Sequence, residues 1–138
     1  MKRGFAVLSL LLTIGCGSVY DPFTDAITPQ EVHVLSETTR FAQMLHVKVT
    51  GALSDYVYSF PCSNDPRQMC IAAGWYDRGV AYYYRPYINR KDTSYGSYVA
   101  AHEVCHAKEF IHGVAHDECV ISLVGYVSLD FSESIAVE

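Results

Sequence analysis

Apolar positions in the first part of the chain recur at the spacing of an α-helix. Between Pro29 and Leu45 these positions are Val32, Leu35, Ala42 and Leu45. The preceding Thr28-Pro29-Gln30-Glu31 has the form of a capping box with proline at the first helical position. We therefore predict a helix from Pro29 to Leu45.

The middle of the chain alternates with the period of a β-strand. Residues 47–50 alternate apolar and polar side chains, and residues 56–60 are aromatic and β-branched, so both segments predict strands. Residues 71–76 and 80–84 flank Asp77-Arg78-Gly79, which is typical of a β-hairpin turn. Because Pro86 cannot donate a hydrogen bond to a neighbouring strand, we expect residues 80–84 to form the edge of the sheet.

The last third of the chain has a helical pattern. Residues 98–101 are apolar and run directly into His102, as in a buried helix. Asp117 is a good N-cap for a second helix through residues 119–123. The prediction is an α+β domain over residues 28–138, with an N-terminal helix, a short antiparallel-rich sheet and two C-terminal helices.

Composition excludes several classes of protein. The chain has 138 residues, half of them hydrophobic, with eleven tyrosines, which supplies enough apolar surface for one folded domain and excludes general disorder. Its formal net charge is -5, so it has no general attraction for phosphate, and we expect no nucleic acid partner. We expect a monomer.

The N-terminus has the pattern of an export signal. A cationic start at Lys2 and Arg3 precedes an apolar run over residues 5–14, which is too short to span a bilayer of about 30 Å as a helix. We predict a signal peptide over residues 1–15 and a tether over residues 16–27. Loss of Lys2 and Arg3 would make the mature chain more acidic.

Leu12-Thr13-Ile14-Gly15-Cys16 resembles the bacterial lipobox, in which the cysteine is lipidated and becomes the mature N-terminus. Thr13 departs from the usual aliphatic residue of that motif. The resemblance implies a lipid anchor at Cys16 in the bacterial cell envelope. The alternative is cleavage at Gly15-x-Gly17 and a freely secreted or periplasmic protein.

The other four cysteines are an even set, for which disulfides are the default in an exported protein. Cys62 and Cys70 bracket a turn-rich segment, and we expect them to pair, which leaves Cys105 to pair with Cys119. The chain has no C-x-x-C sequence, so a cysteine-based zinc knuckle is disfavoured.

His102-Glu103-Val104-Cys105-His106 matches the H-E-x-x-H pattern. On a helix, residues four apart lie about 40° apart around the axis, so His102 and His106 share one face and can bind one metal ion. Glu103 lies on the flank of that face, where its carboxylate can take a proton from water. A helix whose histidines only form hydrogen bonds in the core is the simpler alternative.

This motif resembles the zincin metallopeptidases, and the resemblance covers residues 100–120. It implies a zincin-like fold, one Zn²⁺ ion, Glu103 as general base, and a peptide or protein substrate. In that family an edge strand beside the active-site helix binds the substrate by strand addition, a role that we assign to residues 80–84.

The third zinc ligand has three candidates. His112 has the spacing of the metzincin motif H-E-x-x-H-x-x-G-x-x-H, but Glu109 occupies the glycine position. If the helix runs on to about Ile111, with Gly113 as its left-handed stop, His112 lies about 240° around the helix from His106 and points away.

His116 is the preferred third ligand. His116-Asp117-Glu118-Cys119-Val120 is similar to the H-D-x-x-F pattern of the SprT-like and WLM-type minimal zincins, with valine in place of the aromatic residue. A disulfide between the last two cysteines would bring His116 towards His106. Glu118 is the candidate if the ligand is acidic, as in gluzincins.

These features predict a zinc-dependent metalloendopeptidase of the cell envelope that hydrolyses peptide bonds. The alternative is a non-catalytic envelope lipoprotein that binds a metal or a protein, because tyrosine is enriched in protein–protein interfaces. Hydrolysis of a cell-wall amide would fit the same compartment.

Overall fold

The computed structural model describes residues 26–127 and 135–136 of the chain. The predicted signal peptide, Cys16 and most of the tether lie outside these ranges. The elements are α2 (Pro29–Leu45), β1 (Thr50–Ser54), β2 (Ser59–Pro61), β3 (Met69–Ile71), β4 (Gly74–Asp77), β5 (Val80–Tyr84), α3 (Arg85–Ile88), α4 (Thr93–Cys105), α5 (Val114–Val124) and β6 (Ile135–Ala136). The described part is thus a small α+β fold, as predicted.

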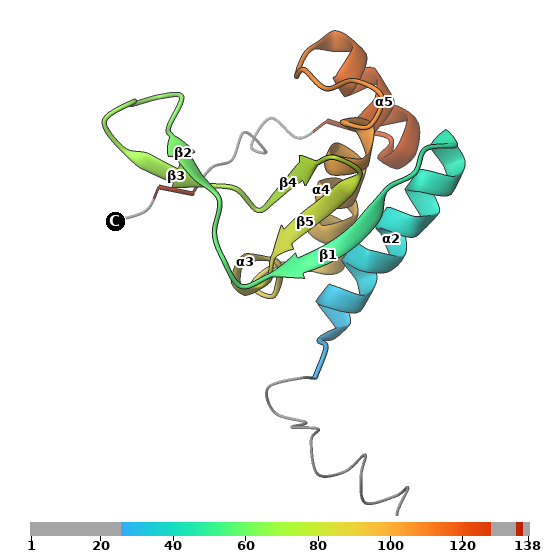
Figure 1. Ribbon diagram of the computed structural model, residues 1–138, viewed down its shortest axis with the longest axis horizontal. Helices are drawn as coiled ribbons and strands as arrows, with labels where there is room; N and C mark the ends of the chain where they lie inside the picture. Colours follow the sequence, from blue (N-terminus) through green and yellow to red (C-terminus); the bar gives the residue numbers. More distant parts are fainter. Residues whose placement is uncertain (1–25, 128–134, 137–138) are drawn as a thin grey trace, which may run out of the picture.

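A mixed three-stranded sheet in the order β1-β5-β4 forms the centre of the molecule (Figure 1). β1 and β5 are parallel, whereas β4 is antiparallel to β5, with Asp77 opposite Val80. Arg78 and Gly79 both have positive φ angles and form the two-residue turn between β4 and β5. Such a turn matches the twist of the flanking strands, and it confirms the hairpin predicted there.

β5 is not an edge strand, because it lies between β1 and β4. The prediction from Pro86 was wrong because Pro86 lies beyond the strand, in the first turn of α3. Proline is well tolerated in a first helical turn, since its missing N–H would have no helical partner there. The strand at the edge nearest α4 is β4.

α2 begins at the predicted capping box. The side chain of Thr28 accepts a hydrogen bond from the backbone N–H of Glu31 at 3.1 Å, and the Glu31 carboxylate accepts one from the N–H of Thr28 at 3.1 Å. Glu31 also accepts from Arg85 Nε at 3.0 Å and from Asn89 Nδ2 at 2.8 Å. Burial alone would raise the pKa of Glu31, but these hydrogen bonds lower it overall and join α2 to α3.

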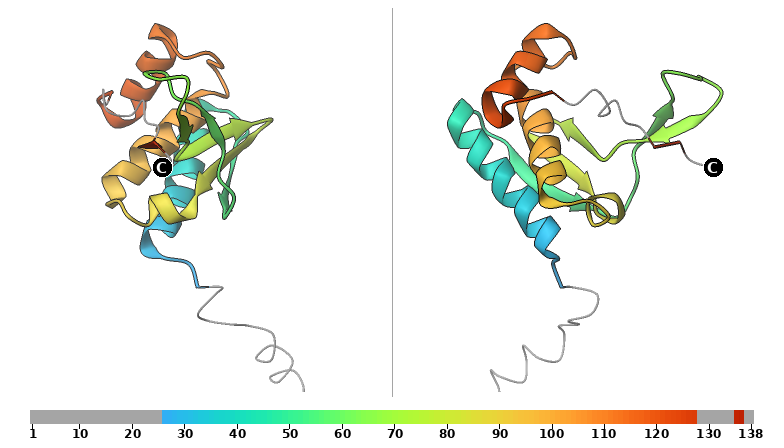
Figure 2. Two further views of the ribbon diagram at one scale, coloured as in Figure 1. Left: turned by 90° about the vertical axis from the view of Figure 1, so that its left-hand side faces the viewer. Right: turned by 180° about the vertical axis from the view of Figure 1, so that it is seen from behind.

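α2 and α4 cover one face of the central sheet (Figure 2). The core between them is almost entirely apolar. Its fully buried members are Val34, Phe41, Ala81, Val99, Ala100, Ala101 and Val104. Tyr83 is also fully buried in this core, and its hydroxyl is satisfied there by a hydrogen bond with Thr38 of α2.

Two disulfides stabilise the parts outside this core. Cys62–Cys70 closes the β2–β3 hairpin, which projects from the central sheet (Figure 1), and Cys105–Cys119 joins α4 to α5. Both predicted pairings are confirmed. The disulfides indicate an oxidising, exported compartment. None of the helices in the described ranges is long and apolar enough to cross a bilayer.

Candidate metal centre

The C-terminal end of α4 positions the first two histidines of the site. Asp92 caps the start of this helix, with its side chain accepting from the N–H of Tyr95 at 3.0 Å. The helix ends at Cys105, and His106 is its C-cap. The rings of His102 and His106 lie 5.0 Å apart between centroids, on the face predicted from their spacing.

α4 ends six residues before Ile111, the limit at which His112 would have pointed away. Its last turn tightens, because the N–H of His106 donates to Glu103 O at 3.2 Å and the N–H of Ala107 donates to Val104 O at 3.0 Å. Glu109 does not have a positive φ angle. The chain therefore turns without the left-handed residue that seemed necessary, and a glycine at position 109 is not required.

Because α4 ends at Cys105, His112 lies beside the other two histidines. Its Nε2 lies 3.0 Å from Nε2 of His102 and 3.0 Å from Nε2 of His106. The expectation that His112 points away assumed a longer helix and is wrong.

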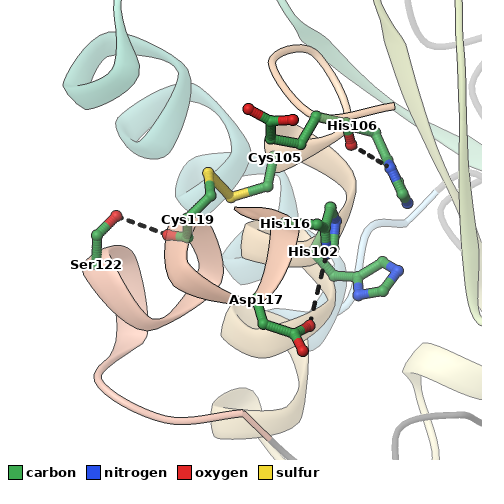
Figure 3. Close-up of a disulfide and its surroundings, with 8 residues drawn as sticks. His102, Cys105, His106, His116, Asp117, Cys119 and Ser122 are labelled. Atoms are coloured by element: carbon green, nitrogen blue, oxygen red, sulfur yellow. Dashed lines mark hydrogen bonds and ion pairs between the residues drawn. A yellow bond between two sulfur atoms is a disulfide. The ribbon is translucent and has the colours of Figure 1, made fainter. Parts of the chain in front are cut away.

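His116 enters from the first turn of α5. That helix begins at Val114 with Gly113 at its N-cap, so the predicted N-cap at Asp117 is wrong by four residues. His116 is 1% exposed, and its Nε2 donates to the carbonyl oxygen of His102 at 3.0 Å. Its Nδ1 is buried without a hydrogen-bond partner. Since Nε2 carries the hydrogen, Nδ1 carries a lone pair that can bind a cation, and the Asp117 carboxylate lies 4.0 Å from this atom (Figure 3).

His102, His106, His112 and His116 form what we call the histidine group. One ring nitrogen from each lies within 4.8 Å of the others, so the group could hold a metal ion. Figure 3 shows three of its members beside the two helices that the Cys105–Cys119 disulfide joins.

Backbone carbonyls orient two of these rings. His106 Nδ1 donates to the carbonyl oxygen of Glu109 at 3.1 Å, which leaves a lone pair on Nε2, the atom that faces the group. His116 is held in the same way by the carbonyl of His102. Glu118, the alternative acidic ligand, is exposed on α5 and is not a member of the group.

Burial favours the neutral form of His102, His106 and His116. It lowers the pKa of His102 to about 2 and that of His106 to about 4, with the neighbouring histidines adding to the shift. Burial also lowers the pKa of His116. A neutral imidazole is the form that binds a metal. With pKa values this low, these rings bind no additional proton at neutral pH and keep their lone pairs for a metal ion.

Glu103 is 4% exposed and lies between α4 and β4. Gly74 of β4 makes this possible, since a Cβ at that position would lie 3.2 Å from Glu103 Cγ and 2.9 Å from Tyr82 O. Burial raises the pKa of Glu103 to about 8. A cation nearby would lower that pKa again and favour the carboxylate.

A cleft of about 710 Å³ opens beside the histidine group. Glu103, His102, His106 and His112 line one side of it, and aromatic residues line much of the rest, namely Tyr58, Phe60, Trp75, Tyr76, Tyr98 and Phe110. Tyr58 stacks on Trp75 at 5.8 Å, and Trp75 stacks on Tyr82 at 5.3 Å. The high aromatic content of residues 56–60 is the signal in the sequence that points to this wall, in addition to the strand predicted there.

The donor set fits a transition metal. Imidazole nitrogens suit Zn²⁺, Cu²⁺, Fe²⁺ and Ni²⁺, and the unpartnered Nδ1 of His116 is a buried polar atom for which a bound cation would provide a partner.

Comparison of the chain with protein-family models gave no match. Comparison with curated proteins and with solved structures gave none either.

Proposed function

We propose that this protein is a zinc-dependent metallopeptidase of the bacterial cell envelope with a zincin-like fold. The convergence of His102, His106 and His116 beside the buried carboxyl of Glu103 is the observation that carries this proposal. Zinc is the metal that the H-E-x-x-H pattern favours, and an imidazole donor set suits it. A lipid anchor at Cys16 would hold the domain at the membrane surface.

The residues around the cleft have separate roles in the proposed reaction. Zn²⁺ in the histidine group would supply a Lewis acid that polarises a carbonyl and lowers the pKa of water. Glu103 would take a proton from water and deliver it to the leaving amine. Glu103 must be ionised to act as a base, and the positive charge of the loaded group would lower its pKa from about 8.

β4 replaces β5 as the strand proposed to bind the substrate. It pairs with β5 on one side only, and Gly74, Trp75 and Tyr76 line the cleft. An extended peptide could add to the other edge of β4 by main-chain hydrogen bonds. Among the described residues that line the cleft there is no lysine or arginine, whereas Asp117 is exposed there, so an acidic segment is disfavoured and apolar side chains suit the aromatic wall.

The test is metal analysis of the purified protein, followed by digestion of casein with and without a chelator. Glu103→Gln should abolish cleavage, a loss of at least about 10²-fold, and leave the metal content unchanged, since Glu103 is not a member of the histidine group. Full activity in this variant would exclude Glu103 from the mechanism.

One observation favours a second candidate, a non-catalytic envelope lipoprotein that binds a metal. The histidine group offers four nitrogen donors, and a four-coordinate site without an open position is typical of structural zinc. One bound zinc without chelator-sensitive cleavage of casein or of cell-wall amides would favour this candidate over the peptidase.

A further inference from the structure

We propose that His112 is an exchangeable fourth ligand, which closes the metal site at rest and must leave before water or a substrate can enter. The inference rests on the metal site of the proposed function. It starts from the difference between His112 and the other three members of the histidine group.

Three members are held by rigid elements. His102 lies within α4, His106 is the C-cap of α4, and His116 lies in the first turn of α5. The Cys105–Cys119 disulfide joins these two helices, with 5.9 Å between the Cα atoms. The rings of His106 and His116 each donate a hydrogen bond to a backbone carbonyl. Their lone pairs are therefore fixed before any metal binds.

His112 lies instead on an exposed loop between the two helices. Phe110 and Ile111 just before it are 76% and 80% exposed, and a Cβ added at Gly113 just after it would meet no atom within 4 Å. Residues 110–113 thus bury little surface, and their displacement would leave intact both the core and the hydrogen bond from His106 to the Glu109 carbonyl. Segments with so few buried contacts open at a low cost in free energy.

The number of donors determines what the site can do. Four histidine nitrogens satisfy tetrahedral zinc completely, as in structural sites, whereas a catalytic site keeps three protein ligands and one open position. With His112 in place the site is closed, and with His112 displaced it has three ligands. Phe110 lines the cleft, so a substrate there contacts the same loop that carries His112.

The test uses the full chain loaded with Co²⁺ in place of zinc, because Co²⁺ absorption reports the number and type of its ligands. Azide is added as a small exogenous ligand. In His112→Ala we expect azide to shift the spectrum at low concentration, and in the wild-type protein only at a concentration at least about tenfold higher, because azide must first displace His112. His46→Asn is the matched control, since His46 lies outside the group and asparagine tolerates its positive φ angle.

Three outcomes would overturn the inference. If no Co²⁺ binds, the metal site of the proposed function fails, and the inference fails with it. If Co²⁺ binds and azide shifts the wild-type spectrum as it shifts that of His112→Ala, the inference alone fails. If His116→Ala rather than His112→Ala creates the azide response, the exchangeable ligand is His116, and the assignment to His112 is wrong.

Discussion

Glu103 and its histidine neighbours respond to burial in opposite directions. Burial disfavours the charged form of each group, so it raises the pKa of Glu103 to about 8 and lowers that of His106 to about 4. One acid and several bases are therefore all neutral in the metal-free protein near pH 7. The free energy of unfolding of the metal-free protein should therefore pass through a maximum as the pH is varied.

The first prediction concerns the free energy of unfolding of the metal-free protein. Below about pH 6.5 the unfolded chain takes up protons on histidines that the folded chain leaves neutral, so stability falls as the pH falls. Between about pH 4.5 and pH 8 folded Glu103 retains a proton that the unfolded chain has lost, so its contribution to stability falls as the pH rises. Below about pH 6.5 the opposite effect of the several histidines is the larger one. Urea unfolding with a chelator should therefore show a maximum near pH 6.5.

Glu103→Gln separates these two effects. In this variant the free energy of unfolding should still fall as the pH drops below 6.5. It should lack the contribution of Glu103, a fall of roughly 2 kcal/mol between pH 6.5 and pH 8, since about 1.4 kcal/mol corresponds to one proton per pH unit. The same decline in wild type and variant would show that another group causes it.

At the scale of elements, the close approach of β4 to α4 determines where Glu103 lies. Gly74→Ala should lower the free energy of unfolding by about 1–3 kcal/mol, because its Cβ would lie 2.9 Å from Tyr82 O and 3.0 Å from Val99 Cγ1. Urea unfolding measures this loss.

Gly96→Ala is the control for that prediction. Gly96 lies inside α4, where a Cβ would meet its nearest neighbours at 3.6 and 3.7 Å, an ordinary contact distance. Alanine is favoured over glycine in a helix interior, so this variant should gain up to about 1 kcal/mol. A loss of similar size in both variants would mean that the space around Gly74 is not the cause.

The helix pair formed by α4 and α5 depends on one covalent link. Replacing Cys105 and Cys119 by alanine should cost about 3 kcal/mol of stability, from a loop of 14 residues. It should also weaken metal binding, since His106 and His116 lie on the two helices that the bond joins. Isothermal titration with Zn²⁺ measures the affinity.

Replacing Cys62 and Cys70 by alanine is the comparison, because that bond closes the β2–β3 hairpin and joins no elements that carry the histidines. Its loss should leave zinc affinity unchanged. Equal losses of affinity in the two double variants would contradict a specific role for Cys105–Cys119.

Local patterns predicted more of this structure than patterns that depend on distant contacts. The capping box predicted the start of α2, the spacing of apolar residues predicted its end, and cysteine spacing predicted both disulfides. The predicted place of β5 at the sheet edge was wrong because strand order depends on pairing between segments far apart in the sequence. His112 was misplaced because the end of α4 is a tightened turn, which no glycine or proline marks.

At the scale of the whole molecule, the proposed lipid anchor at Cys16 would determine where the domain works. A lipidated N-terminus would keep the protein with the membrane, because each buried CH₂ of an acyl chain contributes about 0.8 kcal/mol. Cys16→Ser should therefore move the protein from the membrane fraction to the soluble fraction when the full chain is expressed in a bacterium. Unchanged fractionation would instead favour cleavage at Gly15-x-Gly17.

The bond between α4 and α5 also has a consequence for the order of events in the life of the protein. A disulfide forms after a chain leaves the reducing cytosol, so until then the helices that carry His106 and His116 are not covalently joined. Newly made chains would be poor metal binders, and zinc would be captured only after oxidation. The cell that makes this proposed peptidase would thereby be protected from it during synthesis.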